Sequence, residues 1–324
     1  MSKQGPEIAA AARSLRIHAP RHASEPPLID MAEVAEIELL ILRRMREVAI
    51  GDHRSLSHGT GFDYVGLRDW QDGDRFSTID WAQSTLTNFS PLIVREFEQP
   101  STATVLVVAD ASLSTRCGVH GVSIASLVAR AIATIGMSAV FFQDPFGLAT
   151  FDDSGPHLGA IPPRIGRNQV THCLDAYQHR RGLQELRHTG SMSMTIGSFM
   201  RKPALIPFVS DFLFADPRAV LDELALLNAT HDVFVVLVDA AYAFELPDVS
   251  AGWVEIADVE TGRTRTMSRA ALTAMAGRVR AWQNDVARMA REVGVDVVRF
   301  GTDSAANHLA LAEFVAERRL RKVA

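Results

Sequence analysis

The chain has 324 residues, of which 47% are hydrophobic and 22% charged, with 33 Lys and Arg against 38 Asp and Glu. This composition is typical of a globular protein, and the length allows one large domain or two smaller ones. The net charge of -5 argues against a general attraction to nucleic acid or to an anionic membrane, because both favour a basic surface. A local basic run near the C-terminus (Arg318, Arg319, Arg321 and Lys322) is interpreted as a solvated helix face.

Cysteine usage and the apolar stretches indicate the compartment. Cys117 and Cys173 are the only cysteines, and two isolated thiols cannot form a disulfide framework or a cysteine-rich zinc site. The N-terminus has no signal-peptide pattern. The most apolar stretch, residues 121–142, carries Arg130 at its centre, which favours a buried helix followed by a strand over a membrane span. We therefore expect a cytoplasmic protein.

The N-terminal third divides into three segments. Residues 1–28 lack periodicity and are predicted to be a disordered tail. A helix is predicted to begin at Asp30, with Glu33 in capping-box position, and its apolar face is Val34, Ile37, Ile41, Met45 and Val48. From residue 51 to about 100 the chain is rich in Gly, Asp, Arg and aromatic residues, which is typical of turns and short strands. Residues 29–100 are thus predicted to form a helix followed by a small β-rich insertion.

From residue 101 to the end, predicted strands alternate with predicted helices. The strands are expected at 105–109, 138–142, 148–151, 205–209, 233–238 and 295–300, and a hairpin at 254–266. The helices are expected at 121–135, 167–180, 217–227, 272–293 and from about 305. This alternation predicts an α/β domain over residues 101–324, with a mainly parallel sheet covered by helices on both faces.

An acid and two hydroxyls follow the first strand of this domain. Asp110, Ser112 and Ser114 alternate directly after the continuous apolar run 105–109. Ligands in open α/β sheets bind at the carboxyl ends of strands, and oxygen ligands suit a hard ion such as Mg²⁺ or Mn²⁺. Asp211 follows the apolar run 205–209 in the same way and could complete the site directly or through water. The alternative is that Asp110 and Ser112 only cap the next helix.

These residues and several others resemble a known family. Asp110-x-Ser112-x-Ser114 resembles the metal-ion-dependent adhesion site of von Willebrand factor A domains. The segments at 59–64, 67–68, 73–81, 95–98, 245–247, 258–262 and 314–319 resemble the bacterial family catalogued as domain of unknown function 58. The likeness runs from about residue 35 to the end of the chain.

The resemblance implies a von Willebrand factor A-like (Rossmann-like) domain with an N-terminal insertion. It implies a MoxR-type AAA+ ATPase as protein partner, and a chaperone or adaptor role in maturing or remodelling a client protein. Adhesion sites of this type usually add a Thr ligand from a loop, for which Thr171 is the nearest match, although its neighbours fit the pattern poorly.

The β-rich insertion contains a cluster of charged and aromatic residues: Arg68, Asp74, Arg75, Asp80 and Trp81. They could form a partner-binding surface. Alternatively, the acids pair with the arginines and organise a loop-rich segment, with Trp81 packed beneath.

We predict a non-catalytic, metal-dependent interaction module. The sequence has neither a Gly-x-x-x-x-Gly-Lys phosphate loop nor a Gly-x-Ser-x-Gly elbow. One alternative is a metal-dependent phosphoryl hydrolase with Asp110 as nucleophile. Such sites usually need a second carboxylate two residues later as general acid, a role that Ser112 cannot fill at neutral pH. A metal-free scaffold is the other alternative.

Overall fold

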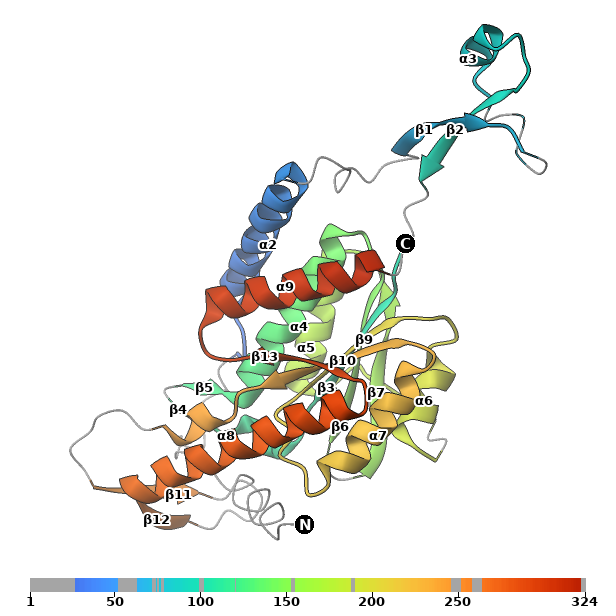
Figure 1. The fold of residues 1–324 in the computed structure, drawn as a ribbon. Coiled ribbons are helices and arrows are strands. Elements are labelled where there is room, and N and C mark those ends of the chain that lie inside the picture. Colours follow the sequence, from blue (N-terminus) through green and yellow to red (C-terminus); the bar gives the residue numbers. More distant parts are fainter. Residues whose placement is uncertain are drawn as a thin grey trace. The chain divides into compact units, whose positions relative to one another are not determined.

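The computed structural model describes residues 27–51, 63–71, 74, 76, 79–98, 102–119, 121–152, 155–187, 190–245, 252–257 and 264–321. The chain divides into two compact units, with boundaries between residues 44 and 45 and between residues 102 and 103 (Figure 1). The larger is an α/β unit, and the smaller unit is inserted into it.

The core of the α/β unit is a seven-stranded sheet in the order β13-β10-β9-β3-β6-β7-β8. Its strands are β3 (Val105–Asp110), β6 (Phe146–Asp152), β7 (Gly155–Arg164), β8 (Gln184–Glu185), β9 (Leu205–Ser210), β10 (Asp232–Val238) and β13 (Asp296–Phe300). The five strands from β13 to β6 are parallel, whereas β7 and β8 run antiparallel at one edge. The predicted α/β class with a mainly parallel sheet is therefore confirmed.

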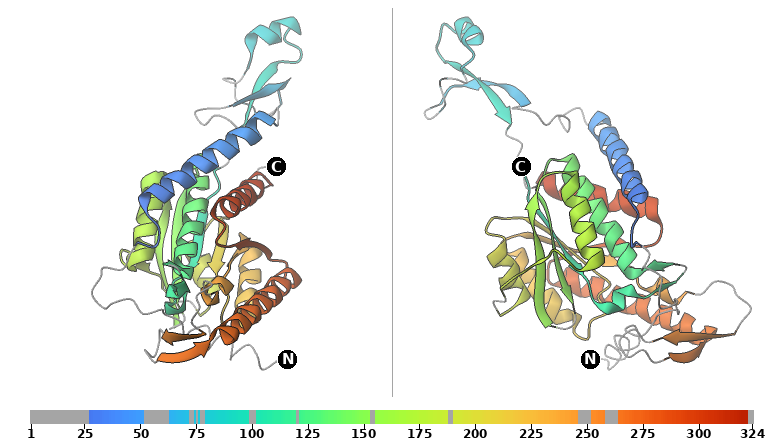
Figure 2. Two further views of the ribbon diagram at one scale, coloured as in Figure 1. Left: turned by 90° about the vertical axis from the view of Figure 1, so that its left-hand side faces the viewer. Right: turned by 180° about the vertical axis from the view of Figure 1, so that it is seen from behind.

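Helices cover both faces of the sheet (Figures 1 and 2). One face carries α4 (Ile124–Phe141), α5 (Arg167–His179) and α9 (Ser304–Arg321), and the other carries α6 (Met192–Phe199), α7 (Pro217–Asn228) and α8 (Arg269–Glu292). Side chains alternate along a strand, so neighbouring residues serve opposite layers. In β10, Phe234 packs against Phe314 of α9, whereas Val233 and Val235 join the core on the side of α6, α7 and α8.

Short elements connect these layers. They are the 3-10 helices η2 (Leu113–Arg116) and η3 (Ala241–Phe244), the small hairpin of β4 (Gly118–Val119) and β5 (Val122–Ser123), and the hairpin of β11 (Trp253–Ala257) and β12 (Thr264–Ser268). The last of these is the hairpin that the sequence predicted at 254–266.

Helix α2 (Met31–Gly51) begins in the α/β unit, although the sequence placed it with residues 29–100. Its apolar face is buried, with Val34, Ile37 and Ile41 at most 2% exposed. Before the helix, Leu28 is also buried, and its backbone N–H donates to Gln178 of α5 at 2.8 Å. The α/β unit therefore begins before the predicted boundary, and residues 1–26 of the predicted tail lie outside the described residues.

Helix α4 is longer than predicted. Residues 138–142, predicted as a strand, are its last turn and its C-cap, and the Ser138 hydroxyl donates to the Thr134 carbonyl at 2.8 Å. A short apolar run does not distinguish a buried strand from a buried helix. Of the described helices, α4 alone is long and apolar enough to cross a membrane, but 83% of it is buried inside the protein. It is therefore a core helix of this fold.

The C-terminal arginines are not on a solvated face, contrary to the sequence-based interpretation. The side chains of Arg318 and Arg319 are only 12% and 11% exposed. Arg318 pairs with Asp232 and Asp296, and Arg319 pairs with Asp144 at 2.8 Å. Arg318 thus fastens α9 to the first residues of β10 and β13, and Arg319 fastens it to the loop before β6. The side chain of Arg321 and all of Lys322 lie outside the described residues.

Gly136 permits the close approach of α4 and α5. A Cβ atom at this position would lie 2.7 Å from Cγ1 of Val170 and 3.2 Å from Cζ of Phe146. Both neighbours are buried, so they cannot easily move aside.

We expect Gly136→Ala to lower the free energy of unfolding by about 1–3 kcal/mol, because overpacking outweighs the better helix propensity of Ala. Gly277→Ala in α8 is the matched control, since a Cβ there meets nothing within 4 Å. It should raise the free energy of unfolding by about 0.5–1 kcal/mol. Urea denaturation measures both, and equal effects at the two positions would contradict the prediction.

The smaller unit contains β1 (Asp63–Asp69), α3 (Trp81–Leu86) and β2 (Ile93–Glu98). The strands pair antiparallel, and Ile79 forms an isolated bridge to Val94. This agrees with the turns and short strands predicted for the segment.

Candidate functional site

The predicted site lies where the strand order of the sheet reverses. From β3 the chain passes through α4 to β6 on one side, and from β9 it passes through α7 to β10 on the other side. Since β3 and β9 are neighbours, their carboxyl ends flank the crevice in which open α/β sheets bind ligands. Asp110 is the last residue of β3, and Ser210 and Asp211 end β9 and follow it.

Asp110, Ser112 and Ser114 come together at the carboxyl end of β3. Asp110 is fully buried, and its Oδ1 accepts hydrogen bonds from the backbone N–H of Ser112 at 2.9 Å and from the Ser112 hydroxyl at 2.6 Å. The Ser112 and Ser114 hydroxyl oxygens are 3.0 Å apart. The three side chains therefore form one continuous polar cluster under the surface.

The structure does not support the alternative in which these residues only cap the next helix. Ser112 precedes η2, but its side chain makes no capping hydrogen bond there. Helix α4 is capped by Ser123, whose hydroxyl accepts from the Ser126 backbone in a capping box. The Asp110 cluster thus serves a purpose other than helix capping.

Ser210 is a member of the cluster that the sequence analysis missed. Its hydroxyl donates to Oδ2 of Asp110 at 2.8 Å and accepts from the backbone N–H of Phe212 at 3.0 Å. Both carboxylate oxygens of Asp110 are consequently held in place: Oδ1 by Ser112 of the following loop, and Oδ2 by Ser210 of the neighbouring strand β9. The sequence does contain a feature that could have identified Ser210: it lies at the end of a predicted strand, directly before Asp211.

Asp211 lies on the loop after β9 and is 2% exposed. Its Oδ1 accepts from the backbone N–H of Leu213 at 3.0 Å, and its carbonyl accepts from the Gln283 side chain at 3.0 Å. Phe212 has a φ of 56°, which is strained for a bulky side chain, and its carbonyl accepts from Trp282 Nε1 at 3.0 Å. Helix α8 thus holds this loop in a fixed conformation beside Asp110.

A third acid, Asp239, follows the next strand in the sheet, β10. Its Oδ1 accepts from the backbone N–H of Ala241 at 2.8 Å, so Asp110, Asp211 and Asp239 each bind the N–H two residues later. Within the described residues, no group of three or more His, Cys, Asp or Glu side chains could hold a metal ion. An ion at Asp110 would therefore need ligands besides these four residue types, such as the hydroxyl groups of Ser112 and Ser114.

Tyr177 of α5 fastens the end of β3. Its hydroxyl donates to the Asp110 carbonyl at 2.7 Å. Burial, and then the charge of Asp110, raise the pKa of Tyr177, so the phenol remains a hydrogen-bond donor at neutral pH. The sequence placed Tyr177 on a helix but gave no signal that its hydroxyl reaches Asp110.

Thr171 lies on α5, six residues before Tyr177. Its hydroxyl contacts the Arg167 carbonyl of its own helix at 3.5 Å. No hydrogen bond between Thr171 and the Asp110 cluster is among those of the described residues, and a role for Thr171 as a metal ligand stays a prediction.

In the smaller unit, the charged residues of the predicted partner surface organise the local structure. Arg68 binds Asp74 through two hydrogen bonds of 2.7 Å, and this contact is the main cause that lowers the pKa of Asp74 to about 2. Asp80 caps α3 by accepting from the Gln83 backbone at 3.1 Å. Trp81 is 58% exposed, so it is not packed beneath the segment, and Arg75 lies outside the described residues.

Two solved structures show a distant similarity to part of this chain. An aerotolerance-related membrane protein from Bacteroides fragilis NCTC 9343 has a TM-score of 0.38 at 12% identity, covering 66% of this chain and 99% of that one. BatB from Bacteroides thetaiotaomicron, a conserved hypothetical protein, has a TM-score of 0.37 at 13% identity, covering 68% and 99%.

Sequence comparison gives more extensive matches. Uncharacterized proteins of Mycobacterium tuberculosis (strain ATCC 25618 / H37Rv) and Mycobacterium bovis (strain ATCC BAA-935 / AF2122/97) are each 28% identical over 301 residues, which is 89% of this chain and 89% of theirs. The model of the family described as Protein of unknown function DUF58 matches residues 66–288, well over half of the sequence. This chain therefore belongs to the DUF58 family.

Proposed function

We propose that this protein is a non-catalytic interaction module in which Mg²⁺, or Mn²⁺, bound by Asp110, Ser112 and Ser114 recruits a carboxylate of a partner protein. The observation that carries the proposal is the contact between these three side chains at the strand-order reversal of the sheet. In this proposal the α/β unit is a von Willebrand factor A-like domain.

The spacing of the oxygens fits Mg²⁺. Two ligands at 2.0–2.1 Å from the ion and at right angles lie about 3 Å apart. The Ser112 and Ser114 hydroxyl oxygens are 3.0 Å apart, and Oδ1 of Asp110 and the Ser112 hydroxyl, at 2.6 Å, would need to separate by only a few tenths of an ångström. Asp211, on the adjacent strand end, could assist through a water molecule.

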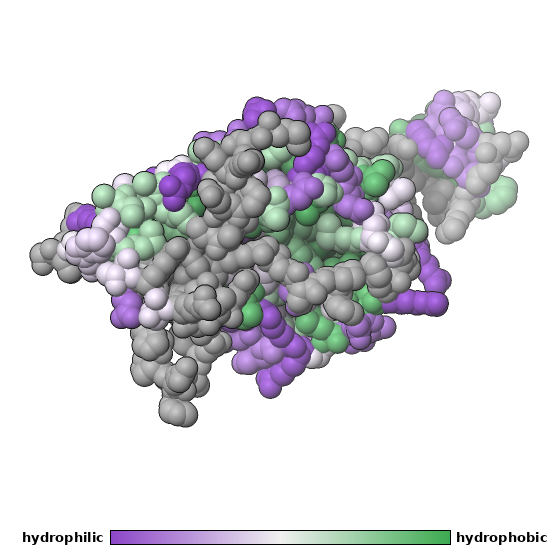
Figure 3. Space-filling model, turned by 90° about the horizontal axis from the view of Figure 1, so that it is seen from below, coloured by the Kyte–Doolittle hydropathy of each residue, from purple (hydrophilic) through white to green (hydrophobic). Residues whose placement is uncertain are grey.

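The charge of such a site favours docking. One carboxylate leaves a divalent ion with net positive charge, which attracts an acidic side chain from outside. In Figure 1, strand β3 runs downward, so its carboxyl end lies on the lower side of the α/β unit. Figure 3 shows the molecule from this lower side. Both hydrophobic and hydrophilic residues appear on the face that Figure 3 shows. Leu113, between the two site serines, is 49% exposed.

Burial of Asp110 supports docking over phosphoryl transfer. Asp110 is 0% exposed, and its two oxygens already accept hydrogen bonds from Ser112 and Ser210, which disfavours its use as a nucleophile toward a phosphoryl group. A metal-free scaffold would show neither metal binding nor turnover. Following the resemblance, we propose a MoxR-type AAA+ ATPase as the partner, a maturation or remodelling role toward a client, and a cytoplasmic location.

Titration with Mg²⁺ tests the metal site. Saturating Mg²⁺, at about 100 times Kd, should stabilise the native protein by about 2.7 kcal/mol in a thermal unfolding assay. Asp110→Asn keeps the size of the side chain but removes the charge of the ligand, so Mg²⁺ should no longer stabilise this variant against unfolding. Asp239→Asn is the matched control, because Asp239 makes the same backbone hydrogen bond without contacting the cluster, and its gain should be retained.

Capture of a purified MoxR-type ATPase in Mg²⁺ or EDTA then tests the partner. Binding that needs both Mg²⁺ and Asp110 supports the proposal. Equal Mg²⁺ responses of the native protein and Asp110→Asn would refute the metal site, and capture that persists in EDTA would refute metal-mediated docking.

A further inference from the structure

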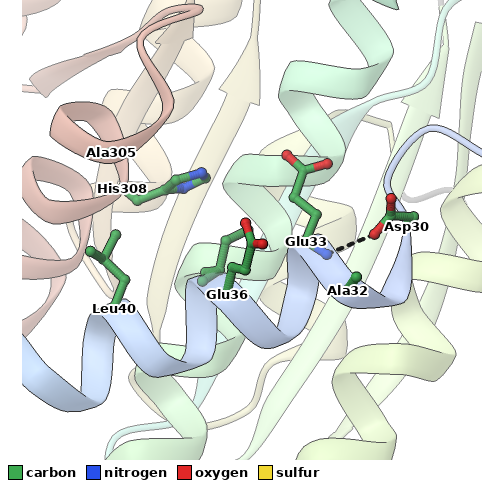
Figure 4. A pocket seen from close by; sticks show the side chains of 8 residues that line it. Asp30, Ala32, Glu33, Glu36, Leu40, Ala305 and His308 are labelled. Carbon is green, nitrogen blue, oxygen red and sulfur yellow. Dashed lines mark hydrogen bonds between the residues drawn. The ribbon is translucent and has the colours of Figure 1, made fainter.

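A second polar site lies between α2 and α9, in a pocket of about 420 Å³ that includes none of the Asp110 cluster. Its lining residues are Asp30, Ala32, Glu33, Glu36, Ile37, Leu40, Ala305 and His308 (Figure 4). All of them belong to the α/β unit. The volume lies in the range of about 300–1,000 Å³ that is usual for small-molecule sites.

His308 is the buried polar side chain of this pocket. It is 3% exposed and points from α9 toward the face of α2 that carries Glu33 (Figure 4). Its Nδ1 lies 2.6 Å from the Thr134 hydroxyl, which donates its own hydrogen to the Arg130 carbonyl at 2.8 Å. The Thr134 oxygen must therefore accept a hydrogen from Nδ1 of His308.

The ring of His308 is neutral at pH 7, because burial, and then the charge of Arg130, lower its pKa to about 4. A neutral imidazole with its hydrogen on Nδ1 has a lone pair on Nε2. No described residue donates a hydrogen bond to this nitrogen. An acceptor that lines the pocket in this state can take a hydrogen bond from a ligand that enters it.

Two of the three carboxylates around the pocket, those of Asp30 and Glu36, have oxygens without a described donor. Glu33 forms an ion pair with Arg130. Among the described residues, Arg130 is the one basic side chain that contacts a residue of the pocket lining in this way. Asp30 uses Oδ1 to accept the Glu33 backbone N–H at 2.7 Å, which leaves its Oδ2 without a described donor. Glu36 is exposed and has no hydrogen-bond or ion-pair partner among the described residues. The lining therefore offers acceptors and negative charge.

We propose that this pocket binds a primary ammonium group carried on an aliphatic chain. The ammonium would donate to His308 Nε2 and to the carboxylates of Asp30 and Glu36, since it has three N–H donors and one compact charge. The aliphatic chain would pack against the apolar lining at Leu40 and Ala305. No lysine or arginine lines the pocket, which disfavours an anion. The absence of a three-ligand cluster among the described residues disfavours a metal ion.

The ammonium group could come from a free amine or from the lysine side chain of a protein. Calorimetric titration of the full chain with 1,5-diaminopentane represents the first source, and titration with the blocked peptide Gly-Gly-Lys-Gly-Gly represents the second. Saturable binding of the diamine alone identifies a free amine, and binding of the peptide identifies a lysine. The isosteric 1,5-pentanediol should not bind, because it has no charge.

Two variants locate the binding. Glu36→Gln and His308→Phe should each weaken binding by about tenfold, the effect of losing one hydrogen bond to a charged group. Glu255→Gln removes an exposed acid on β11 and should change the affinity by less than about twofold. Glu36 is exposed, so its variant remains informative if His308→Phe unfolds. No saturable binding of either probe, or equal affinity in Glu36→Gln and Glu255→Gln, would overturn the proposal.

Discussion

Replacing Arg319 by methionine is expected to lower the free energy of unfolding by roughly 3–5 kcal/mol. Arg319 Nε donates to Asp144 at 2.8 Å, and the guanidinium lies 4.5 Å from the ring centroid of Phe142. Asp144 is 2% exposed, and burial already raises its pKa against the effect of Arg319. Without the arginine, Asp144 would be a buried carboxylate that has lost its ion pair.

Chemical denaturation of two further variants separates this effect from lost packing. In Asp144→Asn with Arg319→Met no charge remains, and the Asn oxygen can still accept the Ala103 backbone N–H, 3.0 Å from the carboxylate in the native protein. The double variant should therefore recover part of the lost stability. Arg288→Met breaks only exposed pairs and should cost less than about 1 kcal/mol. Equal losses for Arg288→Met and Arg319→Met would contradict the prediction.

The second large effect is a loss of stability in mild acid that depends on His308. Its pKa is lowered from 6.5 to about 4 in the folded protein, chiefly by burial and also by Arg130 of α4. The ring also faces Thr134 of the same helix and the Phe300 ring of β13, while Glu33 of α2 pairs with Arg130. The carboxylates of Asp30, Glu33 and Glu36 line the pocket that the ring faces, but burial and Arg130 are the causes that set the direction of the pKa shift.

The direction of this pH effect on stability follows from the protons bound by the folded and unfolded states. Between pH 6.5 and about 4 the unfolded chain binds a proton at His308 that the folded protein does not, so stability falls as the pH is lowered through this window. The full difference is roughly 3 kcal/mol at pH values below both pKa values, from about 1.4 kcal/mol for each pKa unit.

Denaturation of the native protein and His308→Gln at pH 7, 6, 5 and 4.5 measures this contribution. Carboxylates also titrate toward the acid end, so the informative quantity is the difference between the two proteins. Gln carries no titrating group and can still donate to Thr134, so His308→Gln should lose less stability on acidification. His172→Gln, a replacement of an exposed histidine on α5, is expected to keep the native pH dependence. Parallel curves for the native protein and His308→Gln would disprove the assignment.

The sequence alone predicted the α/β layers of the larger unit and the part of the candidate site that follows β3. Continuous apolar runs predicted β3, β9 and β10, because strands covered on both faces have no polar side. The alternation of Asp110, Ser112 and Ser114 after such a run predicted their convergence, since residues two apart turn toward the same side. These inferences succeeded because they depend on neighbours in the chain.

Only the tertiary structure decided which strand ends meet. The adjacency of β3 and β9 brings the Ser210 hydroxyl to Asp110 across 100 residues, and α5 brings Tyr177 across 67 residues. Arg319 likewise resembled a solvated residue until Asp144 was found beside it. Contacts between distant segments depend on how complete helices and strands pack together, and the periodicity of a local segment does not predict that packing.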